Sequence, residues 1–312
     1  MPPFFTARAL FLNCLVLFIA ANPVSGQQEL PELDVSGRPW GEDIVGPYHQ
    51  PRWSARGRFS ADTDVYVLPP YSLFLDLDYR GTFPRNRGKP DHVFVQEIEM
   101  GLPYRFQIAW EFYQELTNGH RQLQQTLIEA RYAFADWKKI PLNPTILGEY
   151  KWGLSKNFSD TGDTGDQEGK NQGPRRVSDS YELRLLLGQE IGTLIEFAGN
   201  IFFEQAVNGT REREMGFSTA WSYALRGEAL KVGVETSYAN ESEHGARSKA
   251  KNIFEIGPSF TVKPGPHTRV DLAPLFGVTN KSPAAEVLMI FSIDFGTGAA
   301  GETEGPVSAR FR

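Results

Sequence analysis

The chain has 312 residues, a formal net charge of −6, a single cysteine, and 12% aromatic and 22% charged residues. The acidic balance argues against nucleic acid as a partner, because nucleic-acid-binding proteins carry basic patches. Cys14 lies in the N-terminal apolar stretch, so disulfides and thiol chemistry are excluded for the rest of the chain.

Residues 1–26 have the pattern of a secretory signal peptide. Arg8 is their only charged residue, residues 9–20 form an apolar core, and small and turn-forming residues follow. This apolar core is shorter than the roughly 20 residues that a membrane-spanning helix needs. We therefore expect export of the chain, with cleavage between Ala20 and Gln27.

Residues 27–70 contain prolines, glycines and tryptophans without a long apolar period, and Arg52, Arg56 and Arg58 make their middle basic. One interpretation is that residues 48–60 enter the mouth of the barrel predicted below and neutralise carboxylates in its interior. The other interpretation is a disordered leader in the periplasm.

Residues 71–295 alternate apolar and polar side chains, as in residues 104–112, Tyr-Arg-Phe-Gln-Ile-Ala-Trp-Glu-Phe. This period of two predicts β-strands with one apolar and one polar face. The apolar faces carry no charge, which suits lipid, since an Arg or Lys at mid-bilayer costs roughly 2–4 kcal/mol. The predicted strands are 71–80, 92–101, 103–115, 122–136, 145–156, 179–190, 192–206, 213–227, 228–240, 252–262, 268–279 and 285–295.

Short or rigid turns follow the even-numbered predicted strands, and longer polar connections follow the odd-numbered ones. Outer-membrane barrels have this asymmetry, with the short turns in the periplasm. The sequence thus predicts an all-β fold, a transmembrane antiparallel up-and-down β-barrel of about twelve strands with both termini periplasmic. Pro258 and Pro274 fall inside strands, where we expect bulges or a local break in pairing.

The signal peptide, the alternating strands and the loop rhythm resemble those of Gram-negative outer-membrane β-barrel proteins over residues 71–295. Residues 97–106, Glu-Ile-Glu-Met-Gly-Leu-Pro-Tyr-Arg-Phe, are similar to a hairpin of porin-like transporters linked by name to the MetA pathway of phenol degradation. The resemblance implies insertion into the outer membrane by its assembly machinery, which usually recognises a terminal Phe. Here Phe295 precedes a polar tail, 296–312, so either the tail is an extension or the last strand is misassigned.

By the same alternation, the polar face points into the barrel and carries seventeen acids against eight bases. The acids are Asp76, Asp78, Glu97, Glu99, Glu111, Glu115, Glu129, Glu149, Glu182, Glu196, Glu204, Glu214, Glu235, Glu255, Asp271, Glu286 and Asp294. The bases are Arg80, Arg105, Arg131, Lys151, Arg184, Arg226, Lys231 and Arg269. An acidic lumen favours cations. A barrel of about eight strands is filled by its side chains, whereas 16–18 strands leave an open channel. Twelve strands are therefore compatible both with an open pore and with a core filled by salt bridges.

The sequence favours a porin-like channel for passive passage of small solutes or cations through this interior. The alternative is a structural or adhesion barrel with a filled core and functional outer loops. We predict no enzyme, because the His-Ser pair of outer-membrane phospholipases and the G-x-S-x-G elbow are absent from the sequence. We also predict no cofactor. Asp160, Asp163 and Asp166 could offer oxygens to Ca²⁺, but their spacing does not match the twelve-residue calcium loop.

Overall fold

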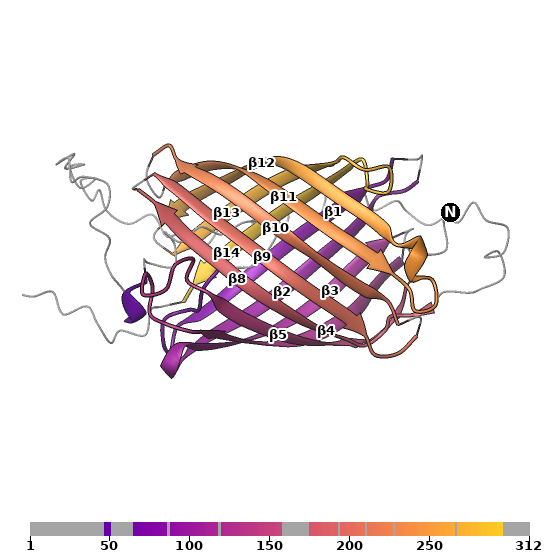
Figure 1. The fold of residues 1–312 in the computed structure, drawn as a ribbon, viewed down its shortest axis with the longest axis horizontal. Helices are drawn as coiled ribbons and strands as arrows, with labels where there is room; N and C mark the ends of the chain where they lie inside the picture. Colours follow the sequence, from indigo (N-terminus) through magenta and orange to yellow (C-terminus); the bar gives the residue numbers. More distant parts are fainter. Residues whose placement is uncertain are drawn as a thin grey trace, which may run out of the picture. The chain divides into compact units, whose positions relative to one another are not determined.

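The computed structural model describes residues 47–50, 65–85, 88–117, 120–157, 175–192, 194–209, 211–226, 229–265 and 267–295. Twelve antiparallel strands close into one barrel (Figure 1). They are β1 (Leu73–Phe83), β2 (Asp91–Leu102), β3 (Phe106–Thr117), β4 (His120–Ala133), β5 (Thr145–Gly153), β8 (Ser180–Ile191), β9 (Ile195–Ala206), β10 (Arg213–Ala224), β11 (Leu230–Ser242), β12 (Lys251–Gly265), β13 (Thr268–Gly277) and β14 (Ala285–Asp294). The predicted twelve-stranded all-β barrel is therefore confirmed, and each strand lies within a few residues of its predicted range.

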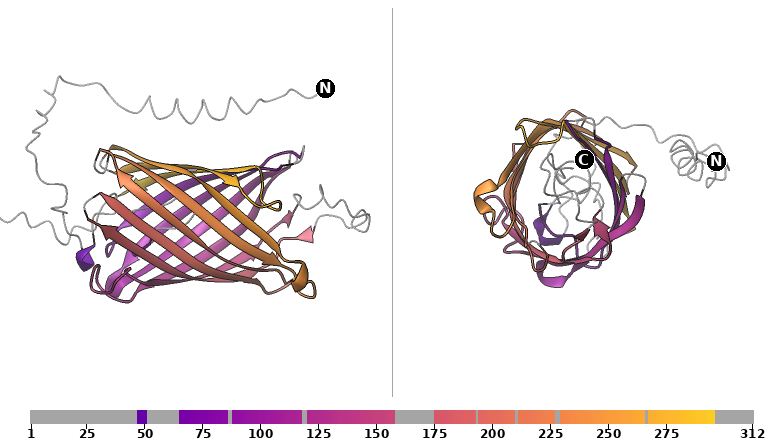
Figure 2. Two further views of the ribbon diagram at one scale, coloured as in Figure 1. Left: turned by 45° about the horizontal axis from the view of Figure 1, so that its top comes forward. Right: turned by 90° about the vertical axis from the view of Figure 1, so that its right-hand side faces the viewer.

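The barrel closes where the first strand pairs with the last. Phe74 of β1 lies opposite Asp294 of β14, and Phe83 lies opposite Ala285. The end-on view in Figure 2 shows the resulting ring. Because the strand number is even, β1 begins and β14 ends at the same end of the barrel. That this end faces the periplasm stays a prediction.

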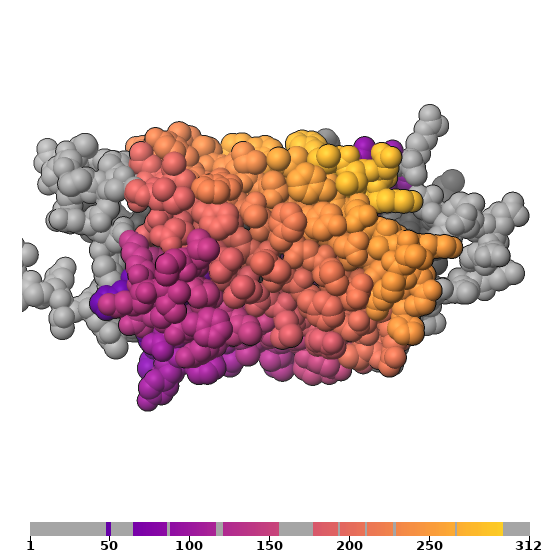
Figure 3. Space-filling view, in the orientation of Figure 1, coloured from indigo at the N-terminus to yellow at the C-terminus, as the bar shows by residue number. Residues whose placement is uncertain are grey.

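Large apolar side chains cover the outside of the wall. Trp110, Ile201 and Trp221 are 52%, 56% and 49% exposed, on three different strands. Figure 3 shows the strands of one face packed into a continuous wall. An apolar exterior around a closed antiparallel barrel is the arrangement that lipid requires. Among the described residues, no helix is long and apolar enough to cross a membrane.

The connections differ between the two ends, which we call the turn end and the loop end. The turn end carries η3 (Pro103–Arg105) and the connections 134–144, 192–194, 225–229 and 266–267. The loop end carries 84–90, 118–119, 154–179 with the strand pair β6 (Lys156–Asn157) and β7 (Arg175–Arg176), 207–212, 243–250 with η6 (Arg247–Lys249), and 278–284. The predicted asymmetry holds with two exceptions, since 118–119 is short and 134–144 is long.

The two prolines interrupt one seam of the wall. The described pairs between β12 and β13 stop at Ile256 and resume at Phe260, and the register across this gap puts Pro258 opposite Pro274. Neither proline has the N–H that would bond to the other strand. Both keep their register on the far side, with β11 and β14 respectively. The expected local break in pairing is therefore present, and it is confined to this seam.

Candidate functional site: the charged barrel interior

The polar face of the strands lies inside the barrel. On β4, Glu129 and Arg131 are 1% exposed, whereas the neighbouring Ile128 is 47% exposed. The same alternation buries Asp76, Glu97, Glu99, Glu111, Lys151, Glu182, Glu235, Glu255, Arg269 and Asp271. It leaves Asp78, Glu149, Arg184 and Glu196 half-buried.

A row of glutamates runs across the inner wall at right angles to the strands. Each member lies directly opposite the next in the strand register, across six neighbouring strands. The row is Glu129 (β4), Glu149 (β5), Glu182 (β8), Glu204 (β9), Glu214 (β10) and Glu241 (β11). Directly opposite like charges destabilise a sheet, so this arrangement works against folding unless cations or water offset it.

Exposure rises along this row toward the loop end. Glu129 and Glu182 are 1% and 2% exposed, while the side chains of Glu204 and Glu241 are 27% and 40% exposed. Arg80, near the loop end of β1, pairs with Glu286 at 3.2 Å and is still 55% exposed. The interior is thus open to solvent at the loop end and closely packed farther in.

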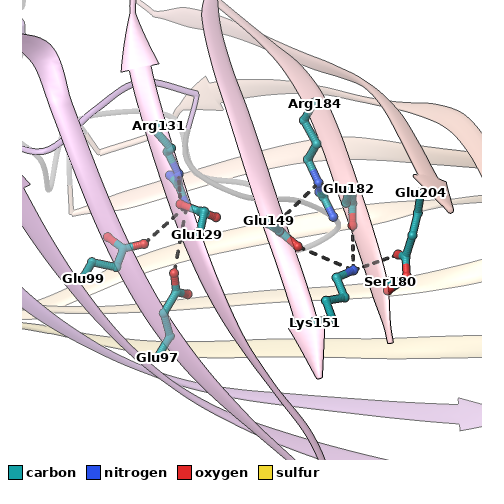
Figure 4. Close-up of polar contacts among 10 residues, drawn as sticks. All are labelled: Glu97, Glu99, Glu129, Arg131, Glu149, Lys151, Ser180, Glu182, Arg184 and Glu204. Carbon is teal, nitrogen blue, oxygen red and sulfur yellow. Dashed lines mark hydrogen bonds and ion pairs between the residues drawn. The ribbon is translucent and has the colours of Figure 1, made fainter. Parts of the chain in front are cut away.

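Lys151 is the cation shared by the middle of the row. Its Nζ lies 2.6 Å from Glu182, 2.7 Å from Glu204 and 3.5 Å from Glu149 (Figure 4). Arg184 forms a second ion pair with Glu182 and lies 3.9 Å from Glu149. Two bases therefore offset three carboxylates from three neighbouring strands.

Arg131 has the same role in a second cluster. It pairs with Glu129 on its own strand and lies 3.6 Å from Glu99 and 3.9 Å from Glu97 on β2 (Figure 4). Carboxylate oxygens of Asp76, Glu97 and Glu99, and of Glu97, Glu111 and Glu129, lie within 4.8 Å of one another. Such oxygens are ligands that Ca²⁺ or Mg²⁺ could use, but Arg131 already supplies positive charge there, and clustering alone does not indicate a metal.

Separate ion pairs line the rest of the wall. Lys231 Nζ lies 2.7 Å from Glu196, and Arg269 Nε lies 2.9 Å from Asp271. Thr261 donates a hydrogen bond to Asp271 at 2.6 Å. The first pair spans β10, from β11 to β9, the second lies within β13, and the hydrogen bond joins β12 to β13. These contacts hold the interior charges against the wall.

Arg105 lies outside this interior pattern. It sits in η3, where Tyr104 and Arg105 both have positive φ, so the alternation expected for a strand beginning at residue 103 does not reach it. Its guanidinium instead donates to the backbone oxygen of Ala133 and pairs with Asp136 at 3.0 Å. The contact joins two turns at the turn end.

The chain before β1 occupies the interior at the turn end. Residues 65–68 are at most 3% exposed. Residues 65–67 pack with Trp137 and the small inward side chains of Ala198 and Ala220, and Leu68 packs with Phe74 of β1. Gly188 lies beside Ala198 in the register, and a Cβ there would come 2.4 Å from the side chain of Val65. A row of small residues on three neighbouring strands thus leaves room for this segment.

Hydrogen bonds fix the same segment to the barrel. Tyr66 donates to the Ala135 oxygen at 2.6 Å, and the Leu68 N–H donates to Gln107 at 2.8 Å. The Trp137 N–H donates to the oxygen of Tyr48, in η1 (Pro47–His49), at 2.8 Å. η1 lies at the turn end in Figure 1. The apolar run 65–68 is the sequence signal for this contact, and it lies within the segment 27–70 that the sequence leaves undivided.

Several predicted features lie outside the described residues. They are the signal peptide, the three arginines Arg52, Arg56 and Arg58, the acids Asp160, Asp163 and Asp166, and the tail 296–312.

The chain matches no protein-family model and no curated protein. Among solved structures, the NanC porin is 12% identical with a TM-score of 0.44, covering 70% of this chain and 99% of that one. An outer membrane channel from Pseudomonas putida F1 is 9% identical with a TM-score of 0.48, covering 74% and 98%. The KdgM porin, in complex with disordered oligogalacturonate, is 9% identical with a TM-score of 0.41, covering 71% and 98%. Matches at this level of identity and TM-score do not indicate a function for this chain.

Proposed function

We propose that this protein is an outer-membrane porin-like channel for passive passage of small solutes or cations through an acid-rich interior. The observation that carries the proposal is the glutamate row from Glu129 to Glu241, which leads from the packed interior to the open loop end. Rings of acidic side chains favour cations in a wet pore. A barrel that only needed a stable core would gain nothing from six carboxylates facing one another.

The proposal includes how the protein reaches the outer membrane. The predicted signal peptide exports the chain, and the outer-membrane assembly machinery inserts the barrel with its short turns in the periplasm. The apolar exterior then contacts the lipid bilayer. The protein works without a cofactor.

Conductance in a planar lipid bilayer tests the channel. The refolded mature chain should give current steps, and in a KCl gradient its reversal potential should have the sign of a cation-selective pore. Glu214→Gln combined with Glu241→Gln removes two charges from the solvent-accessible part of the row and should move the reversal potential toward zero. Glu243→Gln, an exposed acid outside the row, is the matched control and should leave it unchanged.

A structural or adhesion barrel with a filled core is the second candidate. It is favoured by the near-complete burial of Arg131 and Arg269, at 1% and 0% exposure, and by the ion pairs that hold interior charges to the wall. A protein that inserts fully but stays electrically silent, with or without the row variants, would support this candidate and contradict the channel.

The N-terminal part acts, in this proposal, as an internal plug at the turn end. The burial of residues 65–67 against Ala198, Ala220 and Trp137 supports it. Arg52, Arg56 and Arg58 lie between the two described N-terminal pieces in the sequence, and their neutralisation of interior carboxylates stays a prediction. Deletion of residues 27–60 tests it, because unchanged conductance and stability would exclude a plug role for these arginines.

Gly188→Val tests the contact made by residues 65–68. The added side chain would overlap Val65, so the segment should leave its site and the conductance should rise. Gly148→Val is the matched control, because a Cβ at Gly148 meets only Leu183 at an ordinary 3.6 Å. Equal conductance of the two variants would contradict the plug.

A further inference from the structure

A group of basic side chains stands on the outer flank of the loop end, above β10, β11 and β12. We call Arg211, Arg213, Arg247 and Lys249 the basic flank. Arg211 lies just before β10, Arg213 begins it, and the other two belong to η6 between β11 and β12. In the end-on view of Figure 2, the orange turn that carries η6 stands outside the ring of strands. η6 therefore lies on the outer side of the wall, away from the lumen.

Hydrogen bonds hold the guanidinium group of Arg247 close to the start of β10. Arg247 Nη1 donates to the backbone oxygen of Ser242 at 3.0 Å and to its Oγ at 2.9 Å, and Nη2 reaches the oxygen of Arg211 at 3.5 Å. Ser242 is the register partner of Arg213. Arg247 is thus fixed over the start of β10, beside the position of Arg213.

Arg213 points outward, because it shares its face of β10 with the lipid-exposed Phe217 and Trp221. Its Nε is shielded from solvent and has no hydrogen-bond partner. Among the described residues, neither Arg213 nor Lys249 forms an ion pair. Bases without acidic partners are unexpected in a chain with 38 acids and 32 bases, and they remain available to an external anion.

The outer face below the basic flank has the layering of a lipid interface. Tyr238 and Asn240, on β11, both bond to Asn252 Oδ1 at 2.8 Å. Phe217, the register partner of Tyr238 on β10, packs against it with ring centroids 5.4 Å apart. Aromatic and amide groups at a boundary, with apolar side chains below and bases above, match acyl chains, glycerol region and phosphate in that order.

We propose that the basic flank binds the phosphate group of an anionic lipid headgroup. Arginine suits this ligand, since its planar guanidinium donates parallel hydrogen bonds to phosphate oxygens. Two exposed acids, Glu212 and Glu243, lie in the same turns, and the four bases outnumber them. The inference requires that the barrel spans a bilayer, and it does not depend on whether solutes pass through it.

Titration of short-chain phosphatidic acid into the detergent-solubilised full-length protein tests this site, with binding read by isothermal calorimetry. Arg213→Gln combined with Arg247→Gln should weaken binding about 30-fold, as expected for two basic side chains near a lipid surface. Lys249→Gln, which removes an exposed side chain, should weaken it about fivefold and guards against misfolding of the double variant. Lys138→Gln combined with Lys139→Gln, at the turn end, is the matched charge control and should bind like the parent.

Comparison with other ligands shows whether the basic flank recognises a lipid phosphate. Phosphatidylcholine, which has no net charge, should not bind at this site, and inorganic phosphate should bind far more weakly because it has no acyl chains. Equal phosphatidic acid affinity of the parent and the Arg213→Gln and Arg247→Gln double variant would overturn the proposal. Inorganic phosphate binding as tightly as phosphatidic acid would also overturn it, because the site would then be a general anion site.

Discussion

Replacing Lys151 with Met should destabilise the barrel through its interior glutamates. Lys151 contacts Glu149, Glu182 and Glu204, and its side chain is 11% exposed. Removal of one partner from a buried ion pair costs about 3–5 kcal/mol. Arg184 still pairs with two of the three carboxylates, so we expect a loss at the lower end of this range, about 3 kcal/mol. Glu204, which Arg184 does not contact, should lose the most stabilisation.

Urea unfolding of the refolded protein in lipid vesicles, followed by tryptophan fluorescence, measures this change. Lys138→Met is the matched control, because Lys138 makes a 2.6 Å pair with Glu190 while its side chain is 56% exposed. An exposed pair contributes at most about 1 kcal/mol. Lowering the pH neutralises carboxylates, so the difference between the two variants should shrink in acid. Equal stability of both variants at neutral pH would refute the reasoning, because the interior would then be screened by water like the surface.

Three further predictions concern the β12–β13 seam, the Arg131 cluster and the segment 65–68. Pro258→Ala combined with Pro274→Ala should raise the free energy of unfolding in urea by about 1 kcal/mol, because each restored N–H can bond across the seam; an unchanged free energy would mean that the strands are held apart by something else. Arg131→Met should lower the free energy of unfolding, measured in the same way, by about 3–5 kcal/mol, since Glu129 and its neighbours lose their shared base. An unchanged free energy of unfolding would argue against a cluster from which water is excluded. Tyr66→Phe removes the bond to the β4–β5 turn and should speed hydrogen exchange of residues 65–68 about fivefold, whereas no change would show that packing alone holds the segment.

The fold could be predicted because its signal repeats along the whole chain. A strand such as β3, with Trp110 outside and Glu111 inside, shows the period of two within nine residues. Twelve such strands, with turns of alternating length, leave few topologies other than a meander closed on itself. The details that alternation does not predict are local, as at η3, where positive φ at Tyr104 and Arg105 ends the alternation.

The site could be predicted only as a set of side chains that share a face. Alternation assigns Glu149 and Glu182 to the inner wall, but it does not say that they lie opposite each other, because the offset between strands depends on the connections between them. Loop 154–179, which joins β5 to β8, is too long to determine that offset from sequence. The glutamate row therefore becomes visible only once the register is known.

The two ends of the barrel interior differ in their exposure to solvent. The glutamate row reaches solvent at the loop end, where the Glu241 side chain is 40% exposed, whereas residues 65–68 lie buried inside the turn end at no more than 3% exposure. The paired bases Lys151 and Arg131 lie between them and hold carboxylates to the wall. Selectivity would then be set where ions enter from the loop end, and flow would be limited where the chain's own N-terminal part packs against small residues. A filled structural core would need no such difference between its ends, so the asymmetry itself favours a channel that is closed from one side.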